Sequence, residues 1–147
     1  METETLASLI DNKYEVLSLL RQLARAQVDV VRDGDMTRLM KLLATKRVLL
    51  NQLQNVERQI DPFRSQDPES RQWRSPQRRQ QARDMTTRCE SLLNEIMLVE
   101  KQCEGELVVR RDAAATRLQG IHSLTQATDA YLSNGPRHSQ LDLSSDT

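Results

Sequence analysis

One unbroken apolar line in the C-terminal half of the sequence constrains the fold more than any other feature. From Ala82 to Tyr131, mostly small or apolar residues recur at steps of three or four, and 14 such steps cover 49 residues. A mean step of 3.5 residues is the heptad period of a helix that packs lengthwise on other helices with a left-handed supercoil. No proline lies between residues 77 and 132. The pattern therefore predicts one helix over 77–132, about 80 Å long if straight.

Two shorter helices are predicted before it, over residues 5–32 and 36–60. Each carries three apolar lines at heptad spacing, which is wider than the two lines that a two-stranded coiled coil buries. We therefore expect each helix to have more than one neighbour. The three lines of the second helix are Met36, Leu43 and Leu50; Leu39, Lys46, Leu53 and Ile60; and Leu42, Leu49 and Val56.

Breaks between these helices have recognisable local signals. Gly34 favours the left-handed backbone conformation that follows a helix end, and Asp35 is a good N-cap for the next helix. Asp61-Pro62 is predicted to end the second helix, and Ser75-Pro76 to open the third. Residues 61–76 are then a loop. Residues 1–133 are predicted to form a single helical domain, and the polar residues 134–147 a disordered tail.

The fold expected from these elements is all-α: an elongated antiparallel helical bundle, resembling a coiled coil, with a long C-terminal helix. We expect its deepest burial where the third helix is apolar on more than one side, between Leu92 and Val99. The first two helices are each roughly 40 Å long, about half the third. If the Gly34 break is a hairpin turn rather than a kink, the stripe from Leu107 to Leu132 is left uncovered. Three arrangements would cover this stripe. The third helix folds back near Gly105 or Gly120, the first two helices lie end to end, or a partner binds to the stripe.

Several single residues have two interpretations. Phe63 and Trp73, in the loop, are expected to anchor the end of the bundle, with an exposed partner contact as the alternative. The loop arginines favour a solvated face over a phosphate site, because acidic residues are interspersed among them. Lys13 and Lys46 are predicted to pack their stems and extend their ammonium groups to solvent, or else to fix helix register. Cys89 and Cys103 are expected to be buried as small apolar residues, with an intermolecular bridge as the alternative.

Composition excludes several classes of function. The 21 basic and 21 acidic residues leave no net charge, which argues against a nucleic-acid binder. No apolar run is long enough for membrane insertion, and the start of the sequence lacks the basic n-region of a secretory signal, so we expect a cytoplasmic protein. Motifs for catalysis, metal binding or cofactor binding are absent from the sequence. We therefore expect no enzyme activity, no metal and no cofactor.

The stretch VVRDGDMTRLMKLLATKRVLLNQLQNVE resembles the FlgN family of flagellar export chaperones. Members carry a long first helix, a Gly-Asp break before a leucine-rich helix with a central basic pair, and a long C-terminal helix ending near a tyrosine. Here the break is Gly34-Asp35, the basic pair is Lys46-Arg47 and the tyrosine is Tyr131. The resemblance covers residues 6–135 in layout. The arginine-rich loop and the sequence LDLSSDT at the end have no counterpart in it.

The resemblance implies a chaperone that binds C-terminal helical segments of hook-associated (hook-filament junction) proteins, prevents their premature assembly and delivers them to the flagellar export apparatus. It places client contacts on the C-terminal helical region. The expected partner-binding residues are Leu107, Leu118, Ile121, Leu124 and Tyr131. A sibling chaperone for the filament-cap protein would share this layout. The alternative from another class is a coiled-coil scaffold or adaptor that self-associates as a homodimer or larger oligomer without a client.

Overall fold

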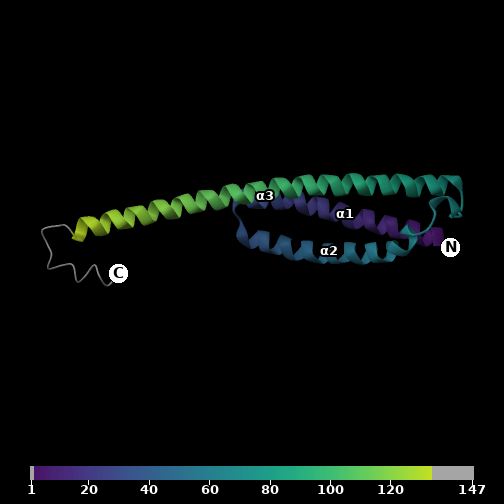
Figure 1. Cartoon of the computed structure of the whole chain (residues 1–147), viewed down its shortest axis with the longest axis horizontal. Helices are drawn as coiled ribbons and strands as arrows, with labels where there is room; N and C mark the ends of the chain where they lie inside the picture. The colour runs from purple at the N-terminus through teal and green to yellow at the C-terminus, as the bar shows by residue number, and fades with distance from the viewer. Residues whose placement is uncertain (1, 134–147) are drawn as a thin grey trace. The chain divides into compact units, whose positions relative to one another are not determined.

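The computed structural model describes residues 2–133 and contains three α-helices in an antiparallel bundle, labelled in Figure 1, in which the second helix runs opposite to the first and to the start of the third. They are α1 (Glu2–Asp33), α2 (Met36–Arg64) and α3 (Pro76–Ser133), and a short 3-10 helix, η1 (Pro68–Ser70), lies between α2 and α3. α3 has 58 residues, against 32 in α1 and 29 in α2. The predicted all-α class, the antiparallel packing and the long C-terminal helix are confirmed. The tail predicted over 134–147 lies outside the described residues.

The break at Gly34 is a tight turn that makes α1 and α2 an antiparallel pair. Gly34 has a φ of 74°, which a side-chain-bearing residue adopts only with strain. Its N–H donates to the carbonyls of Val30 and Val31, and the Asp35 carboxylate accepts from the N–H of Arg38 at 3.0 Å. Both predicted capping roles are confirmed. The end-to-end arrangement of α1 and α2 is excluded, and α3 continues as one helix through Gly105 and Gly120.

The predicted end of the second helix at Asp61-Pro62 is wrong, because α2 continues to Arg64. So close to the helix end, Pro62 removes only one backbone hydrogen bond, because it lacks an N–H donor. Contacts with neighbouring side chains hold the last turn. Phe63 packs against the buried cluster of Leu6, Leu9 and Ile60, and Arg64 pairs with Asp61 one turn earlier. The predicted loop of 61–76 is correspondingly shorter and includes η1.

Ser75 caps α3 as expected, accepting through its hydroxyl from the N–H of Arg78 at 3.1 Å. Trp73, just before this cap, packs with Phe63 against the cluster at the N-terminal end of α1. The expectation that these aromatics anchor one end of the bundle is confirmed. The loop is held there further by Thr3, whose buried hydroxyl donates to the carbonyl of Gln72 at 2.8 Å.

The chain divides into two units, Met1–Glu106 and Leu107–Thr147. In the first unit α1 supplies most of the core: thirteen of its residues are buried, against three in all of α2. The central cluster joins Leu17 and Leu20 of α1 with Leu49 of α2 and Leu92 of α3. α1 is therefore the helix on which α2 and the start of α3 both pack.

Charged pairs cross between the helices at the edges of this core. Lys13 of α1 contacts Glu57 of α2, and Lys46 of α2 contacts Glu100 of α3, each at 2.7 Å. The stems of both lysines are largely covered, with side-chain exposures of 23% and 22%. The two lysines thus pack their stems as predicted, but their ammonium groups end on a carboxylate of a neighbouring helix rather than only in solvent.

Two burial expectations are wrong in the first unit. Between Leu92 and Val99, Leu93, Met97 and Leu98 are exposed, so this segment is not the most deeply buried. On α2, the line Met36, Leu43 and Leu50 is exposed as well, while the other two lines face the core. The reason is the number of neighbours: two packed helices cover only part of a three-line stripe.

Candidate functional site

The five sequence-predicted contact residues all lie on the part of α3 that belongs to the second unit, and all are exposed. We call Leu107, Leu118, Ile121, Leu124 and Tyr131 the distal stripe. The exposed fractions are 39% for Leu107, 67% for Leu118, 61% for Ile121, 68% for Leu124 and 77% for Tyr131. Single exposed leucines are common in proteins, but a row of large apolar residues on one helix face is typical of an interaction surface.

Local sequence explains why this segment is helical. Alanines at 113–115, with leucine, arginine and glutamine, have high helix propensity. Threonine hydroxyls bond back to the helix: Thr125 donates to the carbonyl of Ile121 at 3.0 Å, and Thr128 to that of Leu124 at 2.9 Å. These bonds satisfy polar groups beside the stripe without a partner. The stripe can therefore be covered by an apolar surface without leaving those hydroxyls unpaired.

The stripe also has a defined geometry. The heptad line from Leu107 to Tyr131 has seven steps of three or four residues. Each residue rotates by about 100° around the helix axis, so the line ends about 120° short of seven full turns. The apolar residues therefore drift around the helix as it proceeds. A second helix stays in contact with all five only if the two helices supercoil with a left hand.

Basic side chains lie beside the distal stripe. Arg110 occupies the heptad line between Leu107 and Leu118, and Arg117 lies on the same side. Neither makes an ion pair within residues 2–133, whereas Arg111 is 3.5 Å from the carboxylate of Asp112. Because a buried cation needs a counter-charge, a helix laid along this stripe is expected to bring acidic residues to Arg110 and Arg117.

Sequence reasoning omitted three exposed apolar residues in the same unit. Val108 and Val109 are 40% and 65% exposed and follow Leu107 directly, and Leu132 is 46% exposed beside Tyr131. The adjacent valines were visible in the sequence as a widening of the apolar line. They broaden the apolar surface at the start of the second unit.

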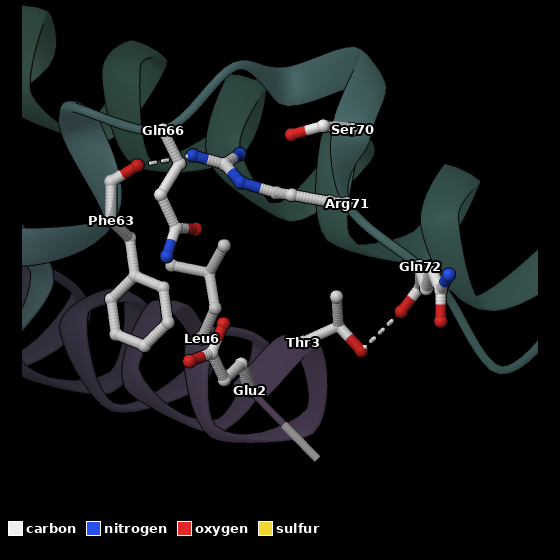
Figure 2. Close-up of a pocket in the computed structure, with 8 residues that line it drawn as sticks. All are labelled: Glu2, Thr3, Leu6, Phe63, Gln66, Ser70, Arg71 and Gln72. Atoms are coloured by element: carbon white, nitrogen blue, oxygen red, sulfur yellow. Dashed lines mark hydrogen bonds between the residues drawn. The ribbon is translucent and has the colours of Figure 1, made fainter.

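A pocket at the other end of α3 offers a different kind of site, lined by residues of α1, α2 and the following loop (Figure 2). Two of its polar side chains bond to backbone carbonyls, whereas the buried Arg71 Nε has no hydrogen-bond partner among residues 2–133. Thr3 donates to the Gln72 carbonyl, and the Arg71 guanidinium donates to the Phe63 carbonyl, as the dashed lines show. These contacts fasten the loop to the end of the bundle. The arrangement has the properties of an anchor, without a nucleophile and base in contact.

Three arginines next to the loop are paired with carboxylates, whereas Arg74 and Arg83 have no ion pair within residues 2–133. Arg64 contacts Glu57 and Asp61, Arg78 lies 3.4 Å from Glu4, and Arg79 lies 3.3 Å from Glu69. Each of these three guanidinium groups thus has a carboxylate within its own unit. This is the interspersed arrangement expected of a solvated charged face.

Both cysteines are buried thiols of the first unit. Cys89 is 2% exposed and Cys103 is 1% exposed, and burial raises the pKa of each thiol. A raised pKa disfavours the thiolate that reacts with disulfides or electrophiles. Their predicted role as small core residues is confirmed, and the intermolecular bridge is inconsistent with this burial. No cluster of three or more potential metal ligands occurs among residues 2–133.

Comparison with known proteins adds no relative. No protein-family model, curated protein or solved structure matches this chain. Within the described residues, no helix is both long and apolar enough to cross a membrane. Any function assigned to the chain therefore rests on its own residues and their geometry.

Proposed function

We propose that the protein is a cytoplasmic flagellar type III export chaperone. It would bind helical segments of hook-associated proteins, prevent their premature assembly and deliver them to the export apparatus. The observation that carries the proposal is the distal stripe: Leu118, Ile121, Leu124 and Tyr131 are each more than 60% exposed on one continuous helix. The resemblance of residues 6–135 to the FlgN family supports the same role and the same segment.

The proposed mechanism is helix pairing. An amphipathic client helix buries its apolar face on the distal stripe, and burial of apolar area supplies most of the affinity. Arg110 and Arg117 select clients with acidic residues at the matching positions. While bound, the client's apolar face is unavailable for assembly with other subunits.

The test is co-expression with the hook-associated proteins encoded by the same genome, followed by purification and mass determination. A stoichiometric complex is expected with the wild-type chain. The triple variant Leu118→Ala, Ile121→Ala, Leu124→Ala is expected to lose it. A matched triple variant on the opposite side of the same helix, Gln119→Ala, Ser123→Ala, Gln126→Ala, retains the complex, because those exposed residues lie away from the stripe.

Helix content measured by circular dichroism must be the same in both triple variants, so that loss of the complex reports lost contacts. If no hook-associated protein forms a complex with the wild-type chain, the proposal is abandoned. Equal client binding by the two triple variants would reject the distal stripe as the site.

A self-associating scaffold is the competing function, because the heptad period of the distal stripe also suits pairing between two copies. The two functions differ in solution without any client. A scaffold sediments as a stable dimer or larger oligomer that the stripe variant dissociates. A chaperone sediments as the same species with or without the stripe substitutions.

A further inference from the structure

We propose that the first unit carries a second docking surface, formed by α2 and α3, which takes an amphipathic partner helix with an acidic residue opposite Arg47. This surface is separate from the distal stripe, and the proposal does not rest on the proposed function. We call it the α2–α3 face. It comprises Met36, Met40, Leu43, Arg47 and Leu50 of α2, and Leu93 and Met97 of α3.

On α2 these residues form a complete heptad line that no helix of the first unit covers. Positions 36, 40, 43, 47 and 50 follow steps of four, three, four and three, which is the a/d spacing of a pairing helix. All five are exposed, with Met40 at 66%. Such a line covers an arc of about 80° on the helix, next to the two lines that face the core.

The contact between Lys46 and Glu100 shows that the α2 and α3 parts lie on the same side of the unit. Lys46 Nζ is 2.7 Å from Glu100 Oε1. Leu43 and Leu50 are three residues before and four after Lys46, and Met97 is three residues before Glu100, so each lies on the same helix face as its charged neighbour. α1 packs against the other sides of both helices, through Leu49 of α2 and Leu92 of α3.

Charge identifies the occupant. Arg47 lies within the apolar line and makes no ion pair with any residue in 2–133, whereas its neighbour Lys46 is paired with Glu100. α2 has no acidic residue before Glu57 that could serve it. A partner that covered Arg47 with apolar atoms alone would bury an unpaired cation at high cost. A helix with a carboxylate at that position, and apolar residues one turn either side, fits both features.

Two exposed methionines in the line match the same occupant. Met36 and Met40 are exposed by 52% and 66%, and methionine side chains are flexible and adapt to different partner surfaces. Specificity would then come from the charge at Arg47 rather than from shape. The proposal therefore predicts that a change of charge at residue 47 changes which helix binds.

The experiment uses the full chain and two designed helical peptides of roughly three heptads with leucine at the pairing positions. One carries Glu at the position that faces Arg47, and the other carries Lys there. Binding of each labelled peptide is measured by fluorescence anisotropy. The Glu peptide is expected to bind about tenfold or more tightly than the Lys peptide, and Arg47→Glu is expected to reverse that preference.

Three further variants locate the binding. The double variant Leu43→Glu, Leu50→Glu is expected to abolish binding of both peptides. Val48→Glu, at an exposed position on another side of α2, leaves binding unchanged. The distal-stripe triple variant also leaves it unchanged, so the outcome is independent of client binding. Circular dichroism confirms that each variant is folded.

Equal affinities of the two peptides, or an unreversed preference in Arg47→Glu, would overturn the proposal. So would peptide binding that is lost with the distal-stripe triple variant. A second copy of the chain is the other candidate occupant. If the wild-type chain sediments as a dimer and Leu43→Glu, Leu50→Glu converts it to a monomer, this face is a self-interface and the proposal is wrong.

Discussion

The ammonium group of Lys46 on α2 lies 2.7 Å from the carboxylate of Glu100 on α3. Lys46 is the one charged residue in an otherwise apolar heptad line of α2. The side chains are 22% and 31% exposed, so water still screens the pair. The stems of both residues pack while the charges meet at the edge of the core. This contact helps to set how α2 and α3 align, since a slip along either helix would separate the charges.

A double-mutant cycle on this pair measures how much the contact contributes to the free energy of unfolding. Lys46→Ala, Glu100→Ala and the double variant are expected to give a coupling free energy of about 0.5–1 kcal/mol in urea unfolding, reduced in high salt. The exposed pair Arg111 and Asp112, 3.5 Å apart on adjacent residues, serves as a control with coupling near zero. A coupling near zero for Lys46 and Glu100 would mean that the contact contributes nothing to stability.

Gln27 is a buried polar residue whose replacement is expected to stabilise the fold. Its amide nitrogen donates to Cys103 Sγ at 3.3 Å, a weak bond, and its side-chain oxygen has no hydrogen-bond partner among residues 2–133. Gln27→Leu removes an unsatisfied buried oxygen and keeps the volume filled. The free energy of unfolding should therefore increase by about 1 kcal/mol. Gln27→Ala should be less stable than Gln27→Leu because it leaves a cavity. Destabilisation by leucine would instead reveal a partner for the oxygen.

Glu57 is expected to make part of the stability depend on acid pH. Burial raises its pKa, but hydrogen bonds from Lys13 and Arg64 outweigh burial and hold the pKa below the ordinary value of 4.5. Its contribution is therefore complete above the unfolded-state pKa and is lost as the pH falls through the folded-state pKa. Urea unfolding of Glu57→Gln should show a weaker loss of stability below pH about 4.5 than the wild type. Glu90→Gln, at an exposed residue without an ion pair in the described chain, should retain the wild-type slope.

Two glycines inside α3 are expected to limit its helix stability. Within the described part of the chain, a Cβ added at Gly105 or Gly120 would meet no atom within 4 Å. Gly105→Ala and Gly120→Ala should therefore each stabilise the helix by about 0.5–1 kcal/mol, seen as higher helix content and slower proteolysis. Gly34→Ala should act in the opposite direction, because φ at that turn is 74°. Faster proteolysis of the α3 variants would contradict the assignment of open space at those positions.

The sequence alone determined the elements and most of their ends. Heptad spacing located three helices, and the cap signals at Gly34, Asp35 and Ser75 were correct because capping is a contact between near neighbours in the chain. The end of α2 was missed at Pro62, where Phe63 and Arg64 extend the helix through tertiary contacts and an ion pair. The distal stripe residues were also identifiable, because an apolar face depends only on helical period.

Only the tertiary structure decided which apolar lines are buried. In sequence, the three lines of α2 are equivalent, yet Leu39 and Leu49 are buried while Met36, Leu43 and Leu50 are exposed. Likewise Leu92 is buried and Leu93 is exposed, one residue apart. The period of a line is a local property of one helix, whereas its burial depends on how many other helices pack against it and from which side. The number and placement of those neighbours are fixed by the whole fold.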